Sequence, residues 1–414
     1  MKRQCYNRKI NTRYGGKSMK AFGETLFTAR IKETKPSIIR EILKVTVDKE
    51  VISFAGGLPN PISFPKSEFK VSLERICDKT ETYQYAQSEG YEPLREYIAN
   101  RYDKRFQMKV DKEDILITTG SQQALDLLGK VLLDQGDKVI IEEPGYLGAI
   151  QAFSMFQPKY VPIKIDENGM DVEKLENELS DNKVKLIYTV PNFQNPVGIT
   201  YSQERRQAIR EIISEKEVFL IEDDPYGELS FDGDSLPYIG KDYQGSVLLG
   251  SFSKTLSPGI RVGYICTKNK QLMQHLITAK QATDLHTSIF SQRLIYDYLT
   301  HNDYDKHISK IRQMYKNQSE YMYQMIKEHF PKEVSCIKPK GGMFMWCELN
   351  GSNVSANELL EYAKEKKVIF VPGDAFYTNT ENLHNMRLNF TNSNEKTIKR
   401  GIKMLGDLLV ERWN

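Results

Sequence analysis

Lys254 lies in the segment SFSKTLSPGIRVGY (251–264), where small hydroxyl residues and an arginine surround one lysine. A lysine amine forms a Schiff base with a carbonyl cofactor when it is desolvated or lies beside another cation. Ser251, Ser253 and Arg261 offer the hydrogen-bond donors and the permanent charge that phosphate prefers. The segment therefore indicates a lysine that carries a phosphorylated carbonyl cofactor. The alternative is one solvated lysine among many.

A second candidate phosphate site is the turn TTGSQQALDLL (118–128), which runs into a predicted helix. The N-terminus of a helix offers free N–H groups and a partial positive charge, and both favour phosphate. Gly120 lets the backbone approach closely, and the side chains of Ser121 and Gln122 can donate hydrogen bonds. The alternative for Ser121 is that it only caps the helix.

Four further residues fit the ring of an aromatic cofactor. A carboxylate such as Asp223 can hold a pyridine nitrogen protonated, which makes the ring an electron sink. Tyr226 and Asn195 can hydrogen-bond a phenolate oxygen, and Tyr146 can stack on the ring face. Taken singly, Asp223 also reads as a loop or cap aspartate, and Tyr146 as a core aromatic residue.

The predicted elements explain how these residues can meet. Short apolar runs alternate with helix-like stretches between about 115 and 270, which predicts a mostly parallel sheet with helices on both faces. The predicted strands are 138–142, 160–165, 185–190, 218–222, 247–250 and 262–267. The predicted helices are 122–134, 172–179 and 202–214, the last with Thr200 and Gln203 at capping-box spacing.

Three polar segments follow three successive strands of this pattern. They are PNFQNPVG (191–198), DDPY (223–226) and SFSK (251–254). In open parallel sheets, ligands bind beyond the carboxyl ends of the strands. We therefore expect the three segments to converge on one site.

Composition sets limits on the class of protein. The 414 residues carry a net charge of +3, which argues against a dedicated nucleic-acid binder, and no apolar run approaches a membrane-spanning length. The five cysteines are widely spaced without a C-x-x-C pair, so we expect reduced thiols in a cytoplasmic protein. The histidines form no metal-binding pattern, and no metal is expected. Residues 1–18 are expected to be a disordered tail or an upstream extension, with Met19 as an alternative start.

The motifs together resemble those of fold-type I, pyridoxal-phosphate-dependent aminotransferases of class I/II, and within that class the 2-aminoadipate and kynurenine aminotransferases. They occur in order over nearly the whole chain after residue 35. Besides the segments above, they are FAGGLPNPISFP (54–65), QYAQSEGYEPLRE (84–96), EEPGYLGAIQAF (142–153), EDDPYGEL (222–229), KPKGGMFMW (338–346) and MRLNFT (386–391).

The resemblance implies a role for each position. Lys254 is the Schiff-base lysine, Asp223 pairs with the pyridine nitrogen, Asn195 and Tyr226 bind the phenolic oxygen, and Tyr146 stacks on the ring. Lys254, Asp223 and Tyr226 are the catalytic residues. The phosphate is held by Ser121, Gln122, Ser251, Ser253 and Arg261.

The resemblance also implies contacts to substrate and to a second subunit. Arg387 clamps the substrate α-carboxylate, beside Asn195, and Gly57 lines the same mouth. Arg40, in KPSIIREILK (35–44), matches an arginine that meets a distal substrate carboxylate; the alternative is a solvated helix arginine. Tyr85 reaches the phosphate of the neighbouring subunit in a homodimer, and the loop ATDLHTS (282–288) contributes from the partner.

The fold class implied is α/β, the aspartate aminotransferase-like fold of pyridoxal-phosphate-dependent transferases, with a mostly parallel sheet in a large domain and a smaller α+β domain. We expect residues 19–60 to join the small domain, 61–300 to form the large domain and 301–414 the small C-terminal domain.

The expected function is a ping-pong transfer of an amino group from an L-amino acid, such as 2-aminoadipate or an aromatic one, to a 2-oxo acid such as 2-oxoglutarate. Two alternatives share most of the motifs. One is a pyridoxal-phosphate-dependent β-lyase, and the other is a non-catalytic cofactor-binding regulator of the MocR type. Only about 50 residues precede AGGLP, too few for a DNA-binding domain with its linker.

Overall fold

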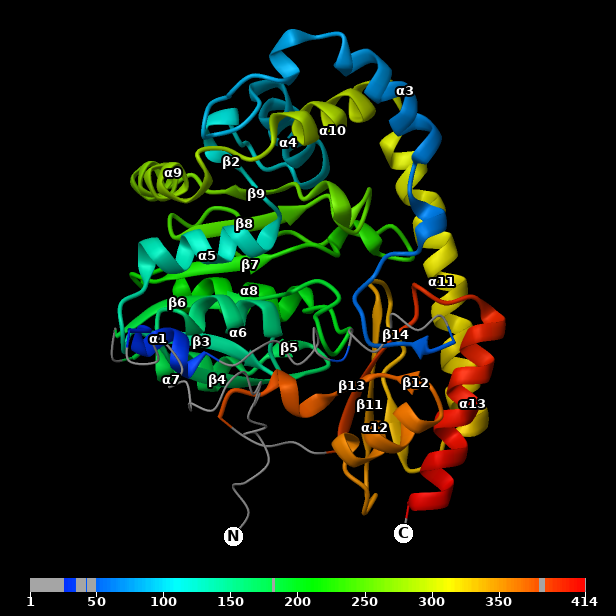
Figure 1. Ribbon diagram of the computed structural model, residues 1–414. Helices are drawn as coiled ribbons and strands as arrows, with labels where there is room; N and C mark the ends of the chain where they lie inside the picture. The colour runs from blue at the N-terminus through cyan, green and yellow to red at the C-terminus, as the bar shows by residue number, and fades with distance from the viewer. Residues whose placement is uncertain (1–25, 35–41, 43–49, 181–182, 380–383, 414) are drawn as a thin grey trace, which may run out of the picture.

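The computed structural model describes residues 26–34, 42, 50–180, 183–379 and 384–413. Their dominant feature is an eight-stranded sheet with the order β2-β9-β8-β7-β6-β3-β4-β5 (Figure 1). Its strands are β2 (Ile115–Thr118), β3 (Lys138–Glu143), β4 (Lys159–Asp166), β5 (Gly169–Met170), β6 (Val184–Thr189), β7 (Phe219–Asp223), β8 (Ser246–Ser251) and β9 (Gly263–Cys266).

The centre of this sheet is parallel, as the sequence predicts. Strands β8, β7, β6, β3 and β4 pair in parallel, whereas β9 is antiparallel to both of its neighbours and β5 is antiparallel to β4. Central parallel strands are covered on both faces, so they read as nearly continuous apolar runs. Leu220 and Ile221 of β7 and Val247 and Leu249 of β8 are fully buried accordingly.

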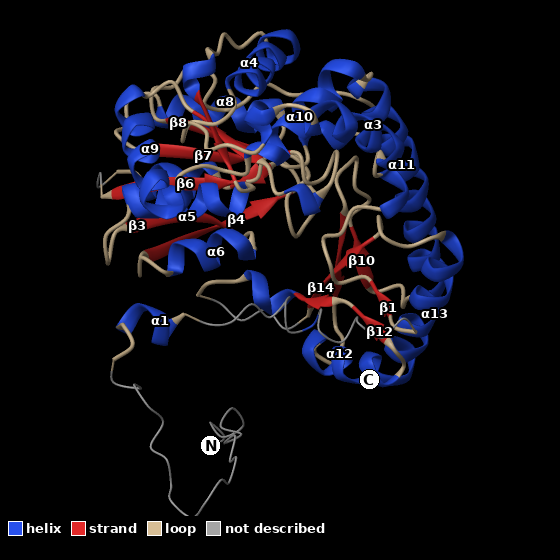
Figure 2. Cartoon of the chain, turned by 45° about the horizontal axis from the view of Figure 1, so that its top comes forward, coloured by secondary structure: helices blue, strands red, loops and turns tan. Residues whose placement is uncertain are grey.

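Helices cover both faces of the sheet. In Figure 2, α5 and α6 lie on one face and α8 on the other. Helix α5 packs against α6 and α9, and α7 packs against α8. These helices are α5 (Ser121–Leu132), α6 (Leu147–Ser154), α7 (Val172–Glu178), α8 (Gln203–Ile213) and α9 (Lys270–Asp284). The helices near the β2 edge are α3 (Lys66–Cys77), α4 (Glu92–Phe106) and α10 (Ile289–His301), and the short α1 is Ala29–Glu33.

The start of α8 differs from the predicted capping box. Ser202 is the N-cap, and its hydroxyl accepts a hydrogen bond from the N–H of Arg205. The Thr200 hydroxyl is used elsewhere, because it accepts from the N–H of Phe193 at 3.1 Å. The capping-box prediction was therefore wrong by two residues.

The C-terminal part forms a second sheet beside a helix pair. Its four strands have the order β10-β11-β14-β13, all antiparallel, and β1 pairs in parallel with β12. The strands are β1 (Ile52–Ser53), β10 (Val334–Cys336), β11 (Phe344–Leu349), β12 (Val368–Ile369), β13 (Val371–Pro372) and β14 (Asn385–Asn389). The helices are α11 (Tyr304–His329), α12 (Ala356–Glu365) and α13 (Glu395–Arg412), with α11 packed along α13 (Figure 1). Within the described residues, no helix is long and apolar enough to cross a lipid bilayer.

Candidate active site

The three polar segments do converge, because β6, β7 and β8 are adjacent and parallel. The loops at their carboxyl ends meet residues of the small sheet around an open cavity of about 540 Å³. Most of the predicted site residues line this cavity: Gly57, Ser121, Gln122, Tyr146, Asn195, Asp223, Tyr226, Ser251, Ser253, Lys254, Arg261 and Arg387. The sequence did not single out Phe344, Val190 or Gln151, which line it too.

Lys254 follows β8 and presents its ammonium to the cavity. Its Nζ donates a hydrogen bond to the carbonyl oxygen of Gly57 at 2.8 Å. Burial and the nearby charges of Arg387 and Arg261 lower the pKa of Lys254 to about 8, against a smaller opposing effect of Asp223. An amine with this pKa is partly unprotonated near neutral pH and can act as a nucleophile or a base.

Asp223 ends β7 and is buried, with 2% of its surface exposed. The hydroxyl of Tyr188 donates to its Oδ2 at 2.8 Å, while Oδ1 is buried without a hydrogen-bond partner among the described residues. Burial raises the pKa of Asp223 to about 7, although the Tyr188 hydrogen bond opposes the shift. One oxygen of this carboxyl group is thus left for a donor that enters the cavity.

Tyr188 is a site residue that the sequence analysis missed. It lies inside the apolar run of β6, opposite Ile221 of β7. Asp223 is two residues beyond Ile221, so both side chains lie on the same face of the sheet. The signal was a tyrosine hydroxyl in a buried strand, which needs a polar partner; only the strand register identifies that partner.

Arg387, Asn195 and Tyr226 form a hydrogen-bonded row. Arg387 Nη1 donates to Asn195 Oδ1 at 2.7 Å, and Asn195 Nδ2 donates to the hydroxyl oxygen of Tyr226 at 3.3 Å. The Asn195–Pro196 peptide bond is cis. Burial raises the pKa of Tyr226, so its hydroxyl keeps its proton and remains a donor.

Arg387 is held from three sides. Its Nη2 donates to the carbonyl oxygen of Ala55 at 2.6 Å, and its guanidinium lies 4.2 Å from the ring centre of Phe344. Nε is buried without a hydrogen-bond partner in the described part of the chain. Burial lowers the pKa of Arg387 to about 10, so the group stays cationic at neutral pH. A fixed cation with an unused donor suits a carboxylate ligand.

The other end of the cavity is the start of α5. Gly120, with a φ of 78°, is the N-cap, and Ser121 is the first helical residue. The alternative that Ser121 only caps the helix is therefore wrong, and its buried Oγ has no partner among the described residues. A Cβ on Gly120 would lie 2.5 Å from Arg261 Nη2, so only glycine lets this arginine reach the helix end.

The remaining cavity residues are fixed by local contacts. The Ser251 hydroxyl accepts from the N–H of Ser253 at 3.1 Å, and Gln122 Nε2 donates to the carbonyl oxygen of Gly148 at 2.9 Å. Tyr146 precedes α6, and its ring packs over Gly148, where a Cβ would lie 2.4 Å from the tyrosine Cζ. Burial raises the pKa of Tyr146 to about 12.

One predicted residue does not line this cavity, and a second lies outside the described residues. Tyr85 is 81% exposed, and its ring meets the edge of His286 at 5.8 Å between centres. Arg40 and most of its segment lie outside the described residues.

A buried lysine behind α5 was also missed. Lys280 of α9 is fully buried, and its ammonium donates to Gln123 Oε1, Asp284 Oδ1 and Thr287 Oγ1 at 2.9, 2.9 and 3.0 Å. Gln123 Oε1 also accepts from the N–H of Thr119, next to Gly120. The predicted loop 282–288 therefore supports the α5 turn of its own chain.

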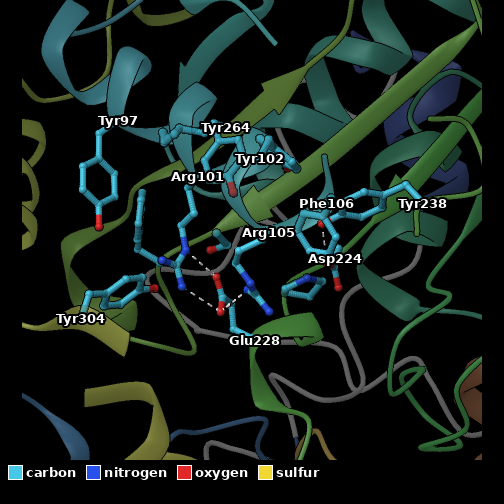
Figure 3. A pocket seen from close by; sticks show the side chains of 14 residues that line it. Tyr97, Arg101, Tyr102, Arg105, Phe106, Asp224, Glu228, Tyr238, Tyr264 and Tyr304 are labelled. Atoms are coloured by element: carbon cyan, nitrogen blue, oxygen red, sulfur yellow. Dashed lines mark hydrogen bonds and ion pairs between the residues drawn. The ribbon is translucent and has the colours of Figure 1, made fainter. Parts of the chain in front are cut away.

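A second polar cluster lies behind the loop that carries Asp223 and Tyr226. Figure 3 shows Arg101 and Arg105 of α4 pointing toward Glu228, which follows Tyr226 by two residues. Arg101 donates to both carboxylate oxygens of Glu228 and to Asp305, and Arg105 pairs with Glu228. The cavity here is only about 40 Å³, room for water but not for a substrate.

The comparisons with known proteins agree with this geometry. The family model described as aminotransferase class I and II matches residues 63–405. The chain is 39% identical over 397 residues to aromatic-amino-acid aminotransferase 1 of Thermococcus litoralis, over 94% of this chain and 95% of that protein. It is 39% identical over 380 residues to the 2-aminoadipate transaminase of Thermus thermophilus, over 90% and 94% of the two chains.

A solved structure is equally similar. The kynurenine aminotransferase of Pyrococcus horikoshii, crystallised in complex with PMP, KYN and KYA, superimposes with a TM-score of 0.90 at 40% identity and covers 96% of this chain and all of its own. The chain therefore belongs to the class I and II aminotransferases. It has the aspartate aminotransferase-like fold of pyridoxal-phosphate-dependent transferases, it is an enzyme that transfers amino groups, and its family implies pyridoxal phosphate as cofactor.

Proposed function

We propose that the cavity holds pyridoxal phosphate and that the enzyme moves an amino group from an aromatic L-amino acid or 2-aminoadipate to a 2-oxo acid such as 2-oxoglutarate. One observation carries the proposal: three buried polar atoms have no hydrogen-bond partner among the described residues, and their residues line one cavity with Lys254. The atoms are Ser121 Oγ, Asp223 Oδ1 and Arg387 Nε. Buried polar atoms are normally hydrogen-bonded, so three unpaired atoms around one cavity support a bound ligand that pairs with them.

Each of the three unpaired atoms suits a different chemical group of a ligand. Ser121 at the start of α5, with Arg261 beside it, suits a phosphate. The free carboxyl oxygen of Asp223 suits a protonated ring nitrogen, and Arg387 suits a substrate carboxylate. The residues that we propose to hold the cofactor are Ser121, Gln122, Tyr146, Asn195, Asp223, Tyr226, Ser251, Ser253, Lys254 and Arg261.

When bound, the cofactor supplies an electron sink for the charge that develops at the substrate α-carbon. The chain supplies proton transfer and orientation. The Lys254 amine, with a pKa of about 8, takes the proton from the substrate α-carbon. It then returns the proton to the cofactor carbon that came from the aldehyde. Asp223 keeps the ring nitrogen protonated, and the Tyr226 hydroxyl donates to the phenolic oxygen.

Arg387 orients the amino acid by its α-carboxylate, and Asn195 holds the guanidinium in place. Gly57 bounds the same space, since a Cβ there would lie 3.1 Å from Phe344 and 3.9 Å from Lys254 Nζ. Arg40 remains a prediction for a distal carboxylate of the substrate. The donor class rests on the relatives that act on aromatic amino acids and 2-aminoadipate.

The first experiment is an absorbance titration of the cofactor-loaded enzyme with single amino acids and no acceptor. We expect aromatic amino acids and 2-aminoadipate to convert the yellow band to that of the aminated cofactor. The conversion should reverse with 2-oxoglutarate. A band that persists with every amino acid, or pyruvate released from a cysteine conjugate without conversion, would contradict the transfer reaction and indicate a β-lyase.

We further propose a cytoplasmic homodimer in which Tyr85 completes the phosphate site of the partner. Tyr85 is exposed and does not line its own cavity, and both observations support this, as does exposed Leu285 beside its contact residue His286. Mixing inactive Lys254→Ala subunits with Tyr85→Ala subunits tests it. If Tyr85 acts across the interface, hybrid dimers regain one complete site and activity rises on mixing. If activity does not rise, Tyr85 acts within its own chain or not at all.

For the domains, we propose the limits given above, with residues 61–300 as the large domain and 301–414 as the small one. The pairing of β1 with β12 supports placing the segment 19–60 with the small domain.

A further inference from the structure

Two cysteines that form no C-x-x-C motif lie opposite each other in the small sheet. Cys336 on β10 pairs in register with Cys347 on β11, in an antiparallel ladder. The N–H of Ile337 donates to the carbonyl oxygen of Trp346. Residues 337 and 346 therefore form the hydrogen-bonded pair of the ladder, and the cysteines form the neighbouring non-hydrogen-bonded pair.

This type of pair brings side chains closest together. The Cα atoms of a non-hydrogen-bonded pair are about 4.5 Å apart, with both side chains on one face. A disulfide accepts Cα separations of about 4.4 to 6.8 Å. The backbone is thus already compatible with a bond between the two sulfurs. The neighbouring Cys336 thiol and burial raise the pKa of Cys347, which agrees with sulfurs in contact.

The two thiols differ in access. Cys336 is half-buried near the end of the edge strand β10, and its Sγ lies 3.8 Å from the carbonyl oxygen of Ile337. Cys347 is fully buried. A disulfide-type oxidant can therefore reach Cys336 first, while Cys347 stands behind it as the second sulfur.

We propose that Cys336 and Cys347 are a site of reversible disulfide formation, which joins the edge strand β10 to β11. With glutathione disulfide as oxidant, the Cys336 thiolate attacks one sulfur and releases one glutathione. The Cys347 sulfur, after losing its proton, then attacks Cys336 and displaces the second glutathione. Two thiol protons leave the protein, and the two electrons reduce one glutathione disulfide to two glutathione molecules.

The other described cysteines serve as internal controls. Cys266 is buried opposite Ile115 and Leu248, neither of which can form a disulfide. Cys77 is exposed at the end of α3. Cys77 should therefore take up a glutathione adduct and keep it.

The test incubates the full-length, cofactor-loaded enzyme with glutathione disulfide, blocks the remaining thiols and maps the peptides by mass spectrometry. We expect a cross-link between Cys336 and Cys347, which dithiothreitol removes. The oxidised enzyme should melt a few degrees higher, because the closed loop restrains the unfolded chain. In Cys347→Ser, Cys336 should keep one glutathione.

The proposal is overturned if wild-type Cys336 keeps its glutathione adduct as it does in Cys347→Ser, or if neither cysteine reacts while Cys77 does. Because the decisive comparison uses the wild-type chain, a variant that fails to fold does not block the test.

Discussion

The cavity at Lys254 and the ionic cluster at Glu228 lie on opposite sides of one short loop, and they differ in whether their polar side chains have hydrogen-bond partners. In the cluster, both carboxylate oxygens of Glu228 accept from arginines, and Arg101 also packs over the ring of Tyr304 at 4.7 Å. In the cavity, Asp223, Ser121 and Arg387 each have a buried polar atom that no described residue pairs with. We infer that the paired charges hold the loop in place, whereas the unpaired polar atoms are available to a ligand.

The adjacent residues Asp223 and Asp224 show the contrast most clearly. Asp224 faces the cluster side (Figure 3), where its Oδ1 accepts from Asn192 Nδ2 and the N–H of Gly227 and its Oδ2 accepts from the Tyr238 hydroxyl. Within the described part of the chain, the Asp223 side chain has a single hydrogen-bond partner, Tyr188. Sequence alone cannot separate two consecutive aspartates, because only the strand pleat and its neighbours decide which faces the ligand.

The largest effect should come from Lys254→Ala, which removes the proposed base. We expect turnover to fall by about 10³- to 10⁴-fold, since proton transfer by a positioned group supplies up to about that factor. The variant should still bind the cofactor through the other cavity residues. Steady-state kinetics and the cofactor absorbance measure both quantities. Lys270→Ala, which removes a mostly exposed lysine paired with Asp114, should change neither, and near-normal activity of Lys254→Ala would refute the assignment.

Asp223→Asn should lower turnover by about 10²- to 10³-fold, because a neutral amide no longer holds the ring nitrogen protonated. Asp224→Asn keeps the shape but weakens structural hydrogen bonds, so it should lower the melting temperature and leave turnover per folded enzyme within a few-fold. Measuring kcat and Tm for both variants sharpens the comparison. Equal losses of kcat in the two variants would mean that the two aspartates do not divide the roles in this way.

These residues also show what the sequence could predict. Apolar runs located the central strands, and polar segments after three of them located the site, because ligands gather at the carboxyl ends of parallel strands. The antiparallel direction of β9 could not be predicted, because the pattern of apolar residues does not show which way a strand runs in the sheet. The partnerships of Tyr188 with Asp223 and of Cys336 with Cys347 depend on register, and the role of Lys280 depends on a helix that packs from far along the chain. The use of Thr200 by Phe193 likewise could not be seen without the loop geometry.

In the cofactor-free protein, the lowered pKa of Lys254 should make the free energy of unfolding depend on pH. Its folded pKa of about 8 lies below the ordinary value of 10.5, so between these values the unfolded chain binds the extra proton. Stability should therefore rise as pH increases from about 8 toward 10.5, by up to about 3 kcal/mol.

Lys254→Met isolates this contribution, because it removes the titrating group and keeps most of the side chain. Denaturant unfolding of both proteins between pH 7.5 and 9.5, a window set by the lysine pKa values, should show wild type gaining stability relative to the variant. A constant difference over this range would show that Lys254 titrates normally.

Glu228→Gln should break the paired cluster and leave two arginines facing a neutral amide. The glutamate and Arg101 side chains retain 24% and 16% exposure, so water moderates the cost. We expect a loss of about 2 kcal/mol in the free energy of unfolding, below the range for fully buried pairs. The cofactor absorbance should be unchanged. Asp305→Asn is the matched control, since this partner of Arg101 is 60% exposed and should contribute less than about 1 kcal/mol. If Asp305→Asn lowered the free energy of unfolding more than Glu228→Gln does, the exposed pair with Asp305 would be the main support of α4.

The smallest effect should come from Lys280→Met, which changes the cofactor site only through its support. The buried ammonium donates to Gln123 Oε1, and the same oxygen accepts from the N–H of Thr119 beside the proposed phosphate-binding turn. Without it the turn loosens, and we expect cofactor affinity to fall about tenfold, equivalent to about 1.4 kcal/mol. Turnover at saturating cofactor should stay near wild type, which separates a positioning residue from a catalytic one. Lys130→Met removes a neighbouring exposed lysine that pairs with Asp126, and it should leave the affinity unchanged. If Lys280→Met lowers stability but not cofactor affinity, the lysine supports α9 alone and the turn is fixed by α5 itself.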